Sequence, residues 1–289
     1  MSRRDLARRA DALEADRVPF VAATVVRAQR PASVRPGDSA IVLADGTIEG
    51  FVGGACAESS VRLHALRVLE TGEALLLRIL PGDGEEAASE GAVTVANPCL
   101  SGGGLEIFLE PRLPAPRVLV VGDTPIAIAL SELGRHVGFD VVLTAELPEL
   151  EPDDAAVVVA SHGRGEEVAL EAALRSGVPY VGLVASRVRG AAVAGSLSVP
   201  ADRLRTPAGL DIGARTPEEV ALSILAEIVA SRRTPTAPTG VTAVDPICGM
   251  EVAATDASPH LDRDGQRFWF CGENCRRTFE ENPAHHAAH

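Results

Sequence analysis

Residues 117–137 read RVLVVGDTPIAIALSELGRHV, and this stretch decides the architecture of the middle of the chain. Its opening is an apolar run rich in valine, which predicts a buried strand over Arg117–Val121. Gly122 marks a turn, and Pro125 stands at the first position of a helix that we expect to extend to Val137. A strand that turns directly into a helix is the repeating unit of a doubly wound parallel sheet.

The same alternation continues to residue 233, after a proline-rich boundary that precedes Arg117. The last helix carries a capping box from Thr216 to Glu219. We therefore predict a Rossmann-like, doubly wound domain over residues 114–233. Its remaining predicted elements are a helix over Glu166–Ser176 and strands over Val141–Leu143, Ala155–Ala160, Tyr180–Val184 and near Leu204.

Residues 1–113 have a different pattern, which predicts an N-terminal α+β domain. Asp45-Gly46 between two apolar runs is a strong hairpin signal. Gly53-Gly54 ends the second run, so Cys56 is expected in the first turn of the helix that follows. The predicted elements are a helix over Ala55–Leu69 and strands over Phe20–Ala28, Ser39–Leu43, Thr47–Val52, Glu73–Leu80, Ala92–Ala96 and Leu105–Leu109.

A linker over residues 234–243 is predicted to lead into a small module over residues 244–289. A module of this size needs a metal or a partner surface to fold. Three thiolates, with His260 as the candidate fourth donor, make a tetrahedral or trigonal soft-metal site, for which zinc is the default and Cu(I) the alternative. The three cysteines, in a C-x22-C-x3-C pattern, are Cys248, Cys271 and Cys275.

Composition excludes several function classes. The 289-residue chain has a formal net charge of −13, and all 27 of its basic residues are arginine. Lysine-dependent chemistry is therefore excluded, and the clustered positive charge that nucleic acid requires is lacking. No apolar run reaches the ~18 residues of a membrane span, and the N-terminus has no signal-peptide core, so a cytoplasmic location is expected. We find no hydrolase or protease motif and predict no catalytic residue.

Two further cysteines lie beside glycines. Cys56 follows Gly53 and Gly54, and Cys99 precedes a run of glycines at 102–104. Glycine lets the backbone approach a bound group, and a helix start lowers the pKa of a thiol. We predict that both thiols contact a ligand, with a buried apolar role for either one as the alternative.

Polar residues at the carboxyl ends of the predicted parallel strands indicate an anion pocket. Ser186 and Arg187 follow one strand, and the loop containing Gly209, Asp211, Gly213 and Arg215 leads into the last helix; backbone amides and arginine suit a phosphate or carboxylate. The dinucleotide fingerprint is incomplete in this domain, because its second glycine is replaced by a threonine at position 124, and this disfavours NAD(P) binding.

Residues 18–233 resemble the XdhC/CoxI family of accessory proteins for molybdenum hydroxylases. The terminal module, with Cys248-Gly249-Met250 and the segment from Phe270 to Cys275, resembles a YHS (TRASH-like) metal-binding domain. The segments that carry the first resemblance are 51–58 (FVGGACAE), 97–99 (NPC), 105–111 (LEIFLEP), 180–183 (YVGL) with Ser186-Arg187, 209–214 (GLDIGA), 216–219 (TPEE) and 223–227 (SILAE).

The resemblance implies a carrier without turnover of its own. Such a protein binds molybdenum cofactor (molybdopterin) transiently, protects it during sulfuration by a cysteine desulfurase, and delivers it to an apo molybdenum hydroxylase such as xanthine or carbon monoxide dehydrogenase. The residues expected to hold the pterin in a shared cleft are the glycine-flanked thiols and the anion pocket described above. The sequence leaves a homodimer open.

Two alternatives from other classes remain at this stage. The doubly wound sheet is compatible with an NAD(P)-dependent oxidoreductase, and the three-cysteine module is compatible with a metal-sensing or metal-delivery protein.

Overall fold

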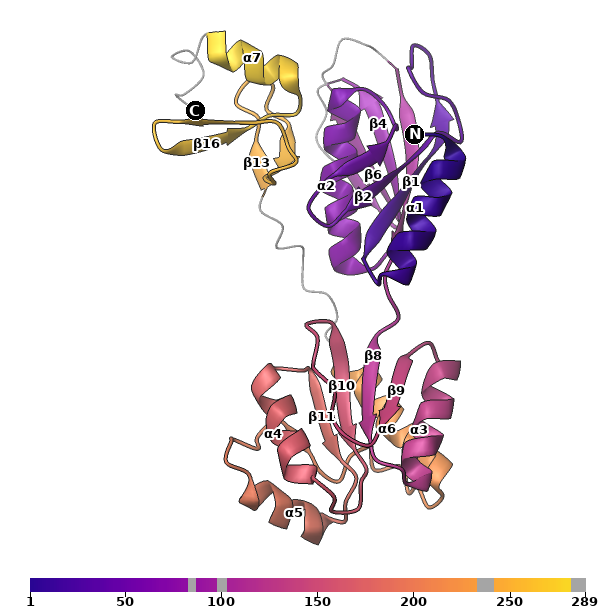
Figure 1. Ribbon diagram of the computed structural model, residues 1–289. Helices are drawn as coiled ribbons and strands as arrows, with labels where there is room; N and C mark the ends of the chain where they lie inside the picture. The colour runs from indigo at the N-terminus through magenta and orange to yellow at the C-terminus, as the bar shows by residue number, and fades with distance from the viewer. Residues whose placement is uncertain (83–86, 98–102, 233–241, 282–289) are drawn as a thin grey trace. The chain divides into compact units, whose positions relative to one another are not determined.

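The computed structural model describes residues 1–82, 87–97, 103–232 and 242–281 (Figure 1). Two compact units are formed. One comprises residues 1–114 together with 235–289, and the other comprises residues 115–234. Among the described residues, no helix combines the length and apolar character that a bilayer crossing requires.

The first unit contains a mixed sheet with the strand order β3-β2-β1-β7-β4-β6-β5. Neighbouring strands are antiparallel except for the parallel pair β4 and β6. The strands are β1 (Phe20–Ala28), β2 (Ser39–Leu43), β3 (Ile48–Gly50), β4 (Leu75–Pro81), β5 (Ala87–Ser89), β6 (Ala92–Asn97) and β7 (Leu105–Arg112).

Alternation along β1 explains how two helices cover this sheet. Val21, Ala23 and Val25 pack in the core that α2 (Ala55–Thr71) completes on one face. Phe20 packs with Leu6 and Leu13 of α1 (Arg3–Ala15) in a separate cluster. Successive strand residues point to opposite faces, so one strand serves both cores. The strand over Phe20–Ala28 and the start of α2 at Ala55 agree with the sequence prediction.

The second unit is a parallel sheet with the order β12-β11-β10-β8-β9, as the doubly wound prediction requires. Helices α3 and α6 contribute to the core on one face, and α4 and α5 pack on the other. The elements are β8 (Arg117–Val121), α3 (Pro125–His136), β9 (Asp140–Thr144), β10 (Asp154–Val159), α4 (Glu166–Ser176), β11 (Tyr180–Leu183), α5 (Arg187–Ser196), β12 (Leu204–Arg205) and α6 (Pro217–Ser231).

Helix α5 was not predicted. Gly190 and Gly195 weaken its helical signal, yet Ser186 caps its start by accepting the backbone N–H of Arg189 at 3.3 Å. Gly190 has a packing role, because a Cβ atom at this position would lie 2.1 Å from Oγ1 of Thr206.

The C-terminal module consists of two small hairpins and one helix. Phe270 and Phe279 are buried in it, with their ring centroids 5.4 Å apart. The module packs against α2, where Arg67 forms an ion pair of 3.0 Å with Glu251. The elements are β13 (Thr242–Val244) paired with β14 (Glu251–Ala253), β15 (His260–Arg263) paired with β16 (Gln266–Trp269), and α7 (Glu273–Glu281).

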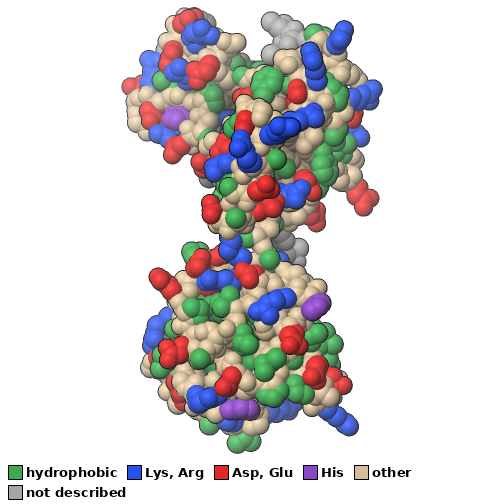
Figure 2. All heavy atoms as spheres, turned by 45° about the vertical axis from the view of Figure 1, so that its right-hand side comes forward, with side chains coloured by type: hydrophobic (Ala, Val, Ile, Leu, Met, Phe, Trp, Pro, Cys, Tyr) green, Lys and Arg blue, Asp and Glu red, His purple; other side chains and the backbone are tan. Residues whose placement is uncertain are grey.

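Charged side chains of both signs are intermingled on the face shown in Figure 2. Arginine side chains there lie among aspartate and glutamate rather than gathering in one basic surface.

Candidate functional sites

Three cysteines of the C-terminal module form a thiol cluster. Sγ of Cys271 lies 3.6 Å from Sγ of Cys248 and 3.6 Å from Sγ of Cys275. Cys248 lies in the turn after β13, Cys271 lies two residues before the start of α7 (Glu273–Glu281), and Cys275 is in the first turn of α7. One carboxylate oxygen of Asp245 joins them, and all four ligand atoms lie within 4.8 Å of one another.

Asp245 explains why the fold brings these cysteines together. Its side chain is fully buried. One carboxylate oxygen accepts the backbone N–H groups of Ile247 at 2.8 Å and Cys248 at 3.4 Å, and the other accepts that of Cys271 at 2.7 Å. The carboxylate therefore connects the turn that contains Cys248 to the backbone at Cys271. Sequence analysis missed this residue, although an Asp-Pro pair before a cysteine turn is a recognisable turn signal.

The donor set fits a soft metal ion. Tetrahedral zinc with Zn–S bonds of about 2.3 Å requires sulfur–sulfur separations of about 3.8 Å, close to the spacing in the cluster. Hydrogen bonding to Cys248 raises the pKa of Cys271, and the same contact lowers the pKa of Cys248. Burial raises the pKa of Cys275 to about 12. A bound cation would displace the thiol protons and would be coordinated by the closely spaced sulfur atoms.

His260 is not part of the group that could hold a metal among the described residues. The residue lies at the start of β15, and its Nδ1 is 2.8 Å from the backbone oxygen of Ser258. Asp245 stands near the three thiols where the sequence analysis expected His260. The geometry does not support the histidine as a ligand, and its assignment stays a prediction.

Cys56 lies in the first turn of α2, as predicted, and after Cys248 its thiol contributes to the raised pKa of Cys271. Gly53, with φ of +149°, and Gly54 direct the chain into this helix. Cys56 also lines a cavity of about 440 Å³, together with Ser33, Gly54, Gly103 and Asn274. Cys99, the second predicted thiol of this part of the chain, lies outside the described residues.

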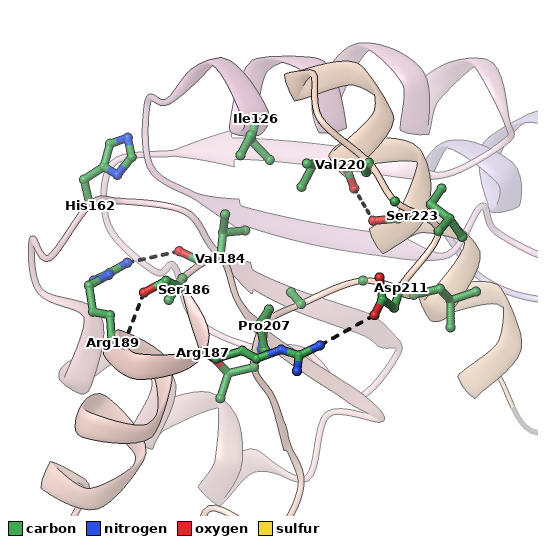
Figure 3. A pocket seen from close by; sticks show the side chains of 18 residues that line it. Ile126, His162, Val184, Ser186, Arg187, Arg189, Pro207, Asp211, Val220 and Ser223 are labelled. Carbon is green, nitrogen blue, oxygen red and sulfur yellow. Dashed lines mark hydrogen bonds and ion pairs between the residues drawn. The ribbon is translucent and has the colours of Figure 1, made fainter.

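The second unit contains a larger pocket of about 970 Å³ (Figure 3). It lies at the carboxyl end of β11, between the start of α5 and the loop that precedes α6. The predicted site residues that line it are Ser186, Arg187, Gly209, Asp211 and Gly213.

A part-buried hydrogen-bond network holds the glycine loop of this pocket. Glu227 on α6 accepts the backbone N–H of Gly209 at 2.7 Å and the hydroxyl of Tyr180 at 2.7 Å. Burial raises the pKa of Tyr180, so the tyrosine stays a neutral donor. Gly209 has φ of +102°, and a Cβ atom there would lie 2.3 Å from Oγ of Ser223. The loop therefore requires glycine at this position.

Two arginines beside the pocket have different environments. Arg187 extends across the opening and lies 3.5 Å from Asp211, with 84% of its side chain exposed (Figure 3). Arg189 donates to the buried Glu166 at 2.6 Å and to the backbone oxygen of Val184 at 3.0 Å. Arg187 is available to an anionic ligand, whereas Arg189 stabilises the side of the pocket through its contacts with Glu166 and Val184. Sequence analysis did not single out Arg189, because its buried partner lies on another helix.

Arg215 does not line the pocket. Its backbone N–H and that of Thr216 donate to Glu219 at 2.7 and 3.1 Å. These two backbone hydrogen bonds lower the pKa of Glu219. Glu219, in the first turn of α6, thus occupies the two N–H groups that precede the helix, and the anion site at Arg215 stays a prediction.

The first βα turn of the second unit, residues 122–124, has a structural role. Gly122 has φ of +132°, and a Cβ atom there would lie 2.2 Å from the backbone oxygen of Ala160. Thr124 uses its hydroxyl to cap α3 by accepting the N–H of Ala127 at 3.2 Å. Asp123 forms an ion pair with Arg164.

A Rossmann-like sheet, an α+β domain and a small three-thiol module together define a multidomain protein with two candidate ligand sites. Residues 13–79 match the XdhC and CoxI family, residues 118–228 match the XdhC Rossmann domain, and residues 243–289 match the YHS domain. The chain belongs to the XdhC and CoxI family and carries a YHS domain in addition.

Two curated relatives are each 28% identical to the chain. The Escherichia coli (strain K12) protein YqeB, described as uncharacterized, aligns over 250 residues, which are 75% of this chain and 44% of that protein. A Bacillus subtilis (strain 168) protein, described as a probable subunit of xanthine dehydrogenase, aligns over 153 residues, 44% of this chain and 46% of that protein. The chain thus spans less than half the length of both relatives.

A crystal structure described as a xanthine dehydrogenase from Bacillus halodurans is also similar to this chain. It shows 17% sequence identity and a TM-score of 0.40. The match covers 80% of this chain and 97% of that one.

Proposed function

We propose that this protein is an accessory factor that carries molybdenum cofactor during maturation of a xanthine dehydrogenase or carbon monoxide dehydrogenase type of enzyme. Membership of the XdhC and CoxI family supports this role, as does the B. subtilis relative described as a probable subunit of xanthine dehydrogenase. Its partners would be the apo-enzyme and a cysteine desulfurase, in the cytoplasm, with the carrier acting alone or as a homodimer.

The pocket of the second unit carries this proposal. Its volume of about 970 Å³ is at the upper end of the range of small-molecule sites. The cofactor to be carried has a phosphate group, for which Arg187 and the backbone of the loop around Gly213 offer donors. Within residues 1–114, Cys56 and Cys99 are proposed separately as thiol ligands of molybdenum, since thiolates are good ligands for a soft metal centre.

Cofactor analysis tests the proposal. Protein purified from cells that make molybdenum cofactor should contain pterin and molybdenum, measured by fluorescence of the oxidised pterin and by elemental analysis. Arg187→Ala should lower pterin occupancy. Arg175→Ala, which alters an arginine on α4 outside the pocket, is the matched control. Wild-type protein without pterin, or equal occupancy in both variants, would contradict the role assigned to the pocket.

Metal delivery through the YHS domain is the second candidate function, favoured by the 3.6 Å spacing of the thiols. A delivery site should release Cu(I) to a competing chelator within the time of an assay, whereas a structural site should retain zinc. The NAD(P)-dependent oxidoreductase alternative predicts micromolar NAD(P) binding, which calorimetry on the full-length protein tests.

A further inference from the structure

The carboxylate of Asp245 is already engaged by the backbone. It accepts three N–H groups, two at one oxygen and one at the other, at 2.7 to 3.4 Å. A carboxylate has about four acceptor positions in all, so three are used before a metal enters. Asp245 therefore orients the chain at Cys248 and at Cys271. The three thiols still need a fourth donor to complete the tetrahedral coordination of a metal ion.

A fourth thiol is present beside the cluster. Cys56, from the α+β domain, lies beside Cys271, the central cysteine of the three, and after Cys248 it contributes to the raised pKa of Cys271. None of the four described cysteines, Cys56, Cys248, Cys271 and Cys275, is part of a disulfide.

Packing around Cys56 supports this contact independently of the sulfur atoms. A Cβ atom at Gly272 would lie 3.0 Å from Cβ of Ala55, so the chain after Cys271 lies against the start of α2. Asn274 lines the same cavity as Cys56. Farther along α2, the ion pair between Arg67 and Glu251 holds the module to the same helix. Residues 1–114 and the module belong to one compact unit.

We propose that Cys56, whose sulfur is not among the four ligand atoms that lie within 4.8 Å of one another, closes on the ion and becomes the fourth ligand of a four-sulfur metal site that joins the XdhC and CoxI domain to the YHS domain. A divalent ion such as zinc would form four metal–sulfur bonds and release four thiol protons to solvent, leaving a net charge of −2 on the site. The positive ends of two helices favour this charge, because Cys56 lies in the first turn of α2 and Cys275 in the first turn of α7.

This site has a consequence for the carrier. A Cys56 thiolate bound to this ion is not available to a molybdenum centre, so metal occupancy of the YHS domain would control access to that thiol. The metal site itself does not rest on the proposed carrier function, since it needs only residues of one unit.

Thiolate counting on the full-length protein tests the inference. The metal-free protein is loaded with Co²⁺, whose sulfur-to-metal charge-transfer absorption grows with each thiolate, or with Cd²⁺ for cadmium NMR. Wild type should show four thiolates and Cys56→Ser three, with metal affinity at least about tenfold weaker in chelator competition. Circular dichroism confirms that the variant is folded.

Two controls complete the experiment. Ser33→Ala changes another residue of the cavity beside Cys56 and should leave the spectrum and the affinity unchanged. Cys99→Ser should retain four thiolates. A three-thiolate spectrum for wild type, an unchanged spectrum for Cys56→Ser, or loss of a thiolate in Cys99→Ser would overturn the assignment. Because no pterin is present in these samples, the outcome is independent of the carrier proposal.

Discussion

The carboxylate of Asp245 accepts the backbone N–H of Cys271 at 2.7 Å, although 26 positions separate the two residues in the chain. This contact helps to hold the cluster of three thiols together, because the same side chain also orients the turn that contains Cys248. A buried acceptor that serves several donors is costly to remove, since each donor then loses its partner away from water.

Asp245→Ala should therefore destabilise the YHS domain by about 3 kcal/mol or more, because three N–H groups lose their acceptor. Denaturant unfolding of the metal-loaded protein, followed by Trp269 fluorescence, measures this change. Asp256→Ala removes a carboxylate that is 91% exposed and should change stability by less than about 0.5 kcal/mol. Equal effects of the two substitutions would refute the structural role of Asp245.

Two glycines of the pocket loop should differ in their tolerance of alanine. Gly209→Ala places a Cβ atom 2.3 Å from Oγ of Ser223, which is itself hydrogen-bonded to Val220, and it also strains a backbone with φ of +102°. Gly213→Ala meets open space and incurs only backbone strain, since its φ is +75°. We expect losses of about 3 kcal/mol and about 1 kcal/mol, respectively, in thermal or urea unfolding. A larger loss for Gly213→Ala would contradict this difference in packing.

Arg187 and Arg189 should separate ligand binding from stability. Arg189→Ala leaves the buried Glu166 without its cation and should cost about 3 kcal/mol. Arg187→Ala removes an exposed side chain and should change stability by less than about 0.5 kcal/mol while reducing anion binding in the pocket. Urea unfolding and pterin retention, measured on both variants, distinguish the two roles.

His64 should make the stability of the first unit depend on pH. Burial lowers the pKa of this histidine to about 4, and nearby Arg67 lowers it further in the same direction, while Glu251 opposes the shift. The unfolded chain, with an ordinary pKa near 6.5, binds a proton that the folded chain excludes. Stability is thus complete above pH 6.5 and falls by up to about 1.4 kcal/mol per pH unit as the pH decreases toward 4.

Unfolding free energies at several pH values measure this contribution. His64→Gln should flatten the curve between pH 4 and 6.5, because its side chain does not titrate in that range. Substitution of the exposed His136 on α3 serves as the control and should leave the slope unchanged. An unaltered slope in His64→Gln would show that other groups cause the pH dependence.

Local signals were sufficient for most of the Rossmann-like fold. The apolar run before Gly122 and the capping box from Thr216 to Glu219 report structure through neighbours in the sequence. Helix α5 escaped prediction because its glycine at 190 serves packing against Thr206, a contact between segments distant in sequence. The phosphate or carboxylate site expected at Arg215 stays a prediction, and the sequence did not show that the capping carboxylate of Glu219 accepts the backbone N–H groups of Arg215 and Thr216.

Sequence patterns were sufficient to predict the doubly wound architecture, the spacing of the three module cysteines and the place of Cys56 at a helix start, because each can be recognised from short motifs along the chain. Tertiary packing was needed to show that Asp245 ties the turns of Cys248 and Cys271 together, that Arg189 is paired with Glu166 while Arg187 is exposed, and that Cys56 lies beside Cys271. These relationships depend on which surfaces pack together, and packing joins residues whose separation along the chain carries no local pattern.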